Sequence, residues 1–152
     1  MCPVRAAVPV NAVSMTFPPD PVWVRSAREA VRTAMTTVVP TKHDLIDTAM
    51  LLTSEAVTNA VVASHHSLTP APIGFRAGWT EDGALHVLVQ DLAPGEPEPA
   101  PGEAEPASAE TSPPASGAEQ GRGIPLITSE ATDWGVCRHG PEEGKSLWFS
   151  LG

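Results

Sequence analysis

Residues 92–120 cannot form part of a folded core, and this segment limits what the rest of the chain can build. It contains seven Pro, seven Ala and six Glu, has no Lys, Arg or aromatic residue, and has Leu92 as its only large aliphatic side chain. Ordering a backbone costs about 1–2 kcal/mol per residue, and this composition offers too little apolar surface to offset the cost. We therefore expect a mobile loop within one domain, because 152 residues suit a single domain of ordinary size.

Charge and the N-terminal segment exclude several classes of function. The formal net charge is −9, with six of these charges in residues 92–120, and the nine Lys and Arg residues form no basic stripe. A nucleic-acid partner is therefore not expected. The first residues, MCPVRAAVPVN, make a poor signal peptide, and about 18 apolar residues in succession occur nowhere. We expect a cytoplasmic protein without membrane attachment, in which residues 1–10 form a flexible tail.

The two cysteines, Cys2 and Cys137, are too few for a disulfide framework and lack the paired spacing of a zinc site. Both are predicted to be free thiols.

The first part of the chain predicts a strand followed by two helices. Residues 11–17 alternate between apolar and polar and stop at a Pro-Pro pair. Asp20 and Pro21 suit the start of a helix that Pro40 ends. The second helix runs to about Ser64, and its apolar side chains recur at helical spacing. They are Leu45, Ala49, Leu52, Ala56 and Ala60.

The second part predicts four strands and one short helix. The runs 73–79 and 84–91 are joined by an Asp-Gly pair, which is a strong signal for an antiparallel hairpin. After the loop, GRGIPLITSEA is a glycine-rich entry to a short helix. Two strands follow, at about 134–138 and 146–151, with a turn between them.

Glu55 and Asn59 are the first residues to suggest chemistry. They are four positions apart in a helix, so their side chains lie on one face about one turn apart. An amide oxygen such as that of Asn59 can ligate Mg²⁺, and a nearby carboxylate can accept a proton from an attacking hydroxyl. Polar pairs on helix faces are also common without any function, so this pair alone does not establish a site.

Two further features fit a nucleotide. Asp91 ends a strand, where its carboxylate could accept a hydrogen bond from an exocyclic amine such as that of adenine. Taken alone, an aspartate that merely starts a turn is the more common case. Gly121, Arg122 and Gly123 precede a helix, and a helix N-terminus with close backbone approach can hold phosphate. Arg122 could add charged hydrogen bonds.

The order of these features resembles the GHKL ATPase superfamily, and most closely its small bacterial anti-sigma-factor serine/threonine kinases. The resemblance covers about residues 13–151. SEAVTNAV is similar to the N box, VQDLAPG to the first glycine box, GRGIPLI to the second glycine box and GKSLWFSL to the closing strand.

The resemblance implies a Bergerat fold, an α/β (α+β) two-layer sandwich with helices on one face of a mixed, mainly antiparallel sheet. Residues 11–152 would form one histidine-kinase-like ATPase domain, and residues 92–120 would be its ATP lid. The implied cofactors are ATP and Mg²⁺.

The resemblance also implies roles for individual residues. Glu55 would be the general base, Asn59 the Mg²⁺ ligand and Asp91 the residue that recognises adenine. Ser146 would stand where the family often has a threonine at the adenine site. Four residues of the two glycine boxes would complete the nucleotide site, and these are Gly95, Gly121, Arg122 and Gly123.

This chain departs from the family pattern at two places. Ala93 and Pro94 occupy the first glycine box where a glycine and a flexible position are usual, which predicts weaker adenine binding. Val62 and Ala63 stand where the family often has a basic residue and a histidine. ATP binding is therefore better supported by the sequence than catalysis.

Two functional hypotheses follow from different classes. The first is a kinase that transfers the γ-phosphate of ATP to a serine of an anti-sigma antagonist protein and sequesters a sigma factor, with a homodimer as a possible assembly. The alternative is a non-catalytic module that binds ATP or sequesters a partner without kinase turnover. A sensor histidine kinase ranks last, since the stretch before the helix of Glu55 leaves no room for a dimerisation hairpin.

Overall fold

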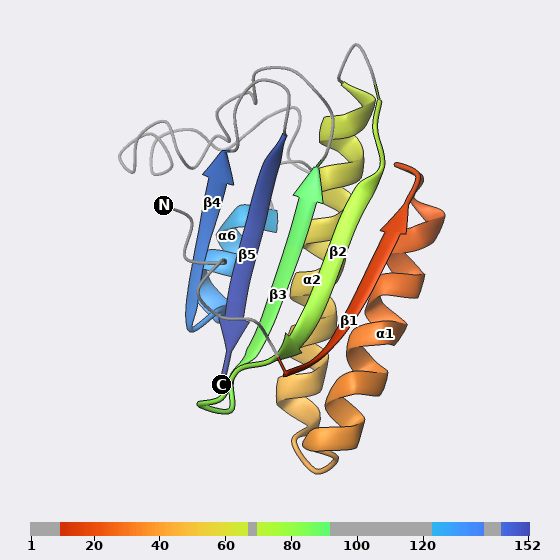
Figure 1. The fold of residues 1–152 in the computed structure, drawn as a ribbon. Coiled ribbons are helices and arrows are strands. Elements are labelled where there is room, and N and C mark those ends of the chain that lie inside the picture. The colour runs from red at the N-terminus through yellow and green to blue at the C-terminus, as the bar shows by residue number, and fades with distance from the viewer. Residues whose placement is uncertain (1–9, 67–69, 92–122, 139–143) are drawn as a thin grey trace.

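The computed structural model describes residues 10–66, 70–91, 123–138 and 144–152 (Figure 1). These residues form five strands and three helices. In chain order they are β1 (Val10–Phe17), α1 (Val22–Val38), α2 (His43–His65), β2 (Ile73–Trp79), β3 (Leu85–Asp91), α6 (Gly123–Glu130), β4 (Asp133–Arg138) and β5 (Lys145–Leu151). Nearly all of the predicted tail and the whole of the predicted lid lie outside the described residues.

The fold is a two-layer α+β sandwich, as the family resemblance implies, but the sheet of the described residues is wholly antiparallel rather than mixed. The sheet has the strand order β1-β2-β3-β5-β4, and every pairing among the described residues is antiparallel. The three helices cover one face of this sheet (Figure 1). In that layer α1 packs on β1 and β2, α2 packs on β3 and β5, and α6 packs beside α2 and β4.

Helix α1 begins and ends where the sequence predicts. The carboxylate of Asp20 accepts a hydrogen bond of 3.0 Å from the amide of Val22, which satisfies one of the free N–H groups at the helix start. Three side chains spaced four residues apart, Ala27, Val31 and Met35, are fully buried.

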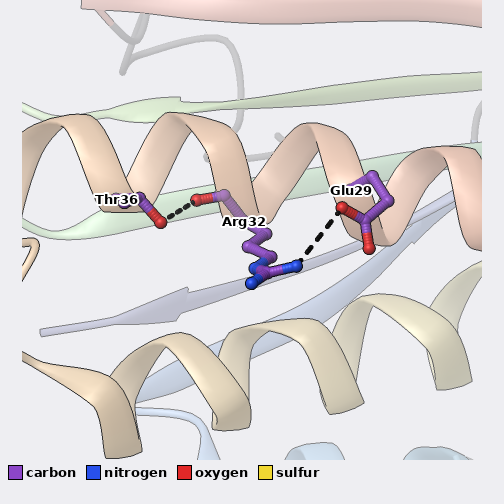
Figure 2. A network of polar contacts seen from close by, with 3 residues as sticks. All are labelled: Glu29, Arg32 and Thr36. Carbon is purple, nitrogen blue, oxygen red and sulfur yellow. Dashed lines mark hydrogen bonds and ion pairs between the residues drawn. The ribbon is translucent and has the colours of Figure 1, made fainter.

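The outer side of α1 is polar and carries only weak contacts (Figure 2). An exposed ion pair joins Arg32 Nη1 to Glu29 Oε2 at 3.7 Å, and the Thr36 hydroxyl donates to the Arg32 carbonyl at 2.7 Å. Such surface contacts contribute little to stability.

Helix α2 is the central helix of the core. Its buried residues include Ala49, Leu52, Ala56 and Ala60 of the stripe that the sequence predicts, whereas Leu45 of that stripe is only half-buried. In length and composition α2 would also suit a membrane span, and no other helix of the described residues does. Its packing against the sheet, α1 and α6 accounts for the same apolar composition.

The hairpin of β2 and β3 sets the register of the sheet. Gly83 adopts a φ of 85°, which favours glycine, and the Thr80 amide donates to the Ala84 carbonyl at 2.8 Å. The two strands then pair without a shift from Trp79 opposite Leu85 to Ile73 opposite Asp91.

On the opposite face of the sheet, the part of the chain that the structure describes places no helix (Figure 1). On this face the imidazole of His86 stacks on the indole of Trp148, with ring centroids 5.4 Å apart.

Cys137 is disulfide-bonded in the structure, so the prediction of a free thiol is wrong for this residue. The chain's other cysteine, Cys2, lies outside the described residues.

Candidate functional site

The end of β3 and the C-terminal half of α2 lie at the same end of the sandwich. Helix α2 ends at His65, and the chain re-enters the sheet at Ile73, which pairs directly with Asp91. Asn59 is six residues before the end of α2, which corresponds to about 9 Å along the helix axis. Residues of α2 and β3 that are far apart in the sequence are thus brought to one edge of the fold.

The start of α6 points toward that same end. Helix α6 ends at Glu130, and the chain then enters β4, whose first residue, Asp133, pairs with Ser150 near the far end of the sheet. Because α6 is eight residues long, its start at Gly123 lies about 12 Å back toward the end that carries Asp91. Gly123, at the start of α6, therefore lies nearer than Glu130 to the end of the fold that carries Asp91.

Glu55 and Asn59 lie on one flank of α2, beside its buried stripe. Both side chains are half-buried, and each directly precedes a buried alanine, Ala56 and Ala60. Because the two residues are four positions apart, their side chains lie about one turn apart on the same side of the helix.

Asp91 is one of the few polar side chains in the core. Its exposed fraction is 7%, and it follows Leu85, Val87 and Val89 at every second position of β3. Alternate residues of a strand share a face, so the carboxylate lies on the face that carries the helices. A carboxylate in this environment is costly unless polar groups satisfy it, which favours a role as a specific hydrogen-bond acceptor.

The structure does not bring Ser146 to Asp91. Ser146 pairs with Gln90, one position earlier in β3, and directly opposed residues share a face. Its side chain is therefore on the face without helices, the opposite side from Asp91. The residue directly across from Asp91 is Lys145, which is half-buried on the helix-bearing face and which the sequence analysis did not assign to the site.

The remaining predicted site residues belong to the two glycine boxes. Gly123 is the first residue of α6. Gly95, Gly121 and Arg122 lie outside the described residues. Within the described ranges no three His, Cys, Asp or Glu side chains form a group that could hold a metal ion by themselves. A divalent cation here would need ligands from a nucleotide and from water, as Mg²⁺ commonly has.

Comparison with known proteins connects this arrangement to a family. The model of the histidine kinase-like ATPase domain matches residues 17–151. The chain belongs to this family. The match covers all three helices and the four strands after β1, so the GHKL membership that the sequence motifs indicate is confirmed. As an ATPase domain, the family implies that the chain binds ATP.

Solved structures support the fold independently. The domain is similar to a chain in the crystal structure of the SiaB-SiaC complex from Pseudomonas aeruginosa, with a TM-score of 0.63 over 91% of this domain and 88% of that chain. The sequence identity is 12%, so the likeness concerns the fold alone. The family match and this structural similarity together confirm the Bergerat fold expected from the resemblance. Among curated proteins no significant match is found.

Proposed function

We propose that this chain is a cytoplasmic serine/threonine kinase of the anti-sigma type, which binds Mg-ATP, phosphorylates a serine of a small antagonist protein and sequesters a sigma factor. The observation that carries the proposal is the match of residues 17–151 to the histidine kinase-like ATPase domain. Its support in the fold is that Asp91 ends β3 at the same end of the sandwich as the C-terminal half of α2, which contains Glu55 and Asn59. The three residues come from an inner helix and an inner strand, which hold them rigidly.

The side chains at this end fit a magnesium nucleotide. Asn59 offers an amide oxygen, a ligand that Mg²⁺ accepts, and Glu55 offers a carboxylate one turn away on the same flank. Asp91 offers an acceptor in apolar surroundings, which suits the exocyclic amine of adenine. Bound Mg-ATP would supply the phosphoryl group and a cation that neutralises its developing charge.

Glu55 is the residue on which phosphotransfer depends. Its carboxylate would accept the proton of the serine hydroxyl while the hydroxyl oxygen bonds to the γ-phosphorus and ADP leaves. General-base catalysis of this kind contributes about 10²–10⁴ in rate. Asn59 and Asp91 serve binding, and they keep that role if the domain only binds ATP.

A protein partner is part of the proposal. The similar fold in the SiaB-SiaC structure is found in a complex of two proteins, which supports a protein partner for this chain as well. The sigma factor, the antagonist and a homodimer are carried over from the family resemblance. The non-catalytic binding module stays the alternative, and the sequence observation that favours it is Ala93 in place of the first glycine.

Glu55→Gln separates the two hypotheses. Calorimetry measures Mg-dependent ATP binding, and labelled γ-phosphate measures transfer to proteins that co-purify with the chain from its native cell. We expect Glu55→Gln to keep the affinity and to lose about 10²–10⁴ of the transfer rate. Asp47→Asn removes an exposed carboxylate from the outer face of the same helix and should change neither quantity.

Each negative result has a distinct meaning. Absence of Mg-dependent ATP binding by the unmodified protein would refute the proposed function as a whole. Transfer that survives in Glu55→Gln at the unmodified rate would remove Glu55 as the base. Binding without any transfer by the unmodified protein would favour the binding module.

A further inference from the structure

Lys145 is placed beside Asp91 by the strand register. Strands β3 and β5 pair at seven consecutive positions without a shift, from Leu85 opposite Leu151 to Asp91 opposite Lys145. Directly opposed residues in an antiparallel pair have Cβ atoms about 4.5–5.5 Å apart on one face. The ammonium of Lys145 can therefore reach any ligand group that the Asp91 carboxylate contacts.

The surroundings of Lys145 restrict what it can do. The residue is half-buried at the first position of β5 and lies on the face that carries the helices. Its aliphatic stem can lie along this apolar face while its ammonium stays at the end of the sheet that carries Asp91.

The two side chains together match the edge of adenine. An ionised aspartate only accepts hydrogen bonds, and a lysine ammonium only donates them. Adenine presents, side by side, the exocyclic N6 amine, which donates, and the ring nitrogen N1, which accepts. We propose that Lys145 is a second base-recognition residue of the nucleotide site, which donates a hydrogen bond to N1 while Asp91 accepts one from N6. This inference rests on the proposed function, because it assumes that Asp91 contacts the base.

The test pairs a change in the protein with a change of a single ligand atom. Calorimetry compares ATP with 1-deaza-ATP, in which a C–H group replaces N1, for the unmodified protein and for Lys145→Met. A hydrogen bond to a charged donor predicts that Lys145→Met weakens ATP binding about tenfold. The same substitution should leave 1-deaza-ATP binding unchanged, because the acceptor is already missing.

Two further variants complete the design. Lys42→Met makes the same substitution at an exposed lysine that precedes α2, at the other end of that helix, and should alter neither affinity. Lys145→Gln removes the charge but keeps a donor, and it should retain part of the discrimination between the two ligands. It also provides the measurement if Lys145→Met fails to fold, which circular dichroism would reveal.

The outcomes distinguish this inference from the proposed function. An equal loss for both ligands in Lys145→Met would overturn it, because Lys145 would then act on the phosphates rather than on N1. Unchanged binding of both ligands would overturn it as well, while ATP binding by the unmodified protein would leave the proposed function intact. Failure of the unmodified protein to bind ATP would instead refute the proposed function.

Discussion

Gly135 on β4 leaves no room for a side chain, because the indole of Trp148 lies directly over it. A Cβ atom at this position would approach three indole atoms at 2.7, 2.9 and 2.9 Å. Ordinary carbon contacts are about 3.5–4.0 Å, so the ring would have to move by close to 1 Å. It has little freedom to do so, since Trp148 is only 8% exposed and its ring stacks on His86 with an interplanar angle of 11°.

The cost of Gly135→Ala follows from this contact. Forcing one extra methyl group into a packed site costs about 1–3 kcal/mol of the free energy of unfolding. The lower backbone freedom of the unfolded chain offsets about 0.4–1 kcal/mol of this cost. Gly74→Ala on β2 measures this unfolded-state effect alone, because a Cβ atom at Gly74 would meet Gln90 at an ordinary 3.6 Å. The difference between the two variants is therefore the overpacking cost itself.

Urea unfolding monitored by tryptophan fluorescence measures both free energies. We expect Gly74→Ala to be neutral or slightly stabilising and Gly135→Ala to be less stable than it by about 1–3 kcal/mol. Near-ultraviolet circular dichroism should change in Gly135→Ala, because the stacked indole must shift. Equal free energies of unfolding for the two variants would refute the close approach of β4 to Trp148.

Two further predictions concern charge. Burial lowers the pKa of His86 below its usual 6.5, and Asp133 opposes this in part, so the unfolded chain binds the proton more readily. Stability should therefore be full above about pH 6.5 and fall as the pH drops below it. His86→Gln should flatten this fall in urea titrations at several pH values, and parallel curves would contradict the prediction. Arg32→Ala breaks the exposed ion pair with Glu29 and should change the free energy of unfolding by less than about 1 kcal/mol. A larger loss of stability would contradict the small contribution expected of an exposed ion pair.

The elements that the sequence predicts well are those with a clear period. Helix α2 carries Leu52 and its buried alanines at helical spacing, and it ends at His65, one residue from the predicted Ser64. Strand β3 alternates between buried and half-buried side chains along its whole length. Because of this alternation, the side of the sheet that Asp91 occupies can be inferred from the sequence by counting back from Asp91 in steps of two.

The convergence of the site could be predicted only through the family resemblance. Asn59 and Asp91 lie toward the same end of the sandwich because the chain leaves α2 and re-enters the sheet at Ile73, across from Asp91. The pairing of Ile73 with Asp91 follows from the hairpin at Gly83, which the sequence indicates. The packing of the helices on one face of the sheet also positions the site, and local sequence patterns do not specify that packing. Spacing along the chain predicts the face of one helix, but it does not determine which side chains on other elements lie opposite.

Strand β5 shows why the sequence alone does not determine which residue of the closing strand lies beside Asp91. Four successive residues, from Ser146 to Phe149, are buried, so the strand lacks the alternation that assigns faces in β3. Without that signal, the sequence favours Ser146 as the counterpart of the threonine that the family often has at the adenine site. The strand register instead places Lys145 on the side of Asp91. A slip of one residue moves a side chain to the other face of the sheet. The chemistry that follows differs accordingly, because a hydroxyl both donates and accepts hydrogen bonds, whereas an ammonium only donates and carries a charge.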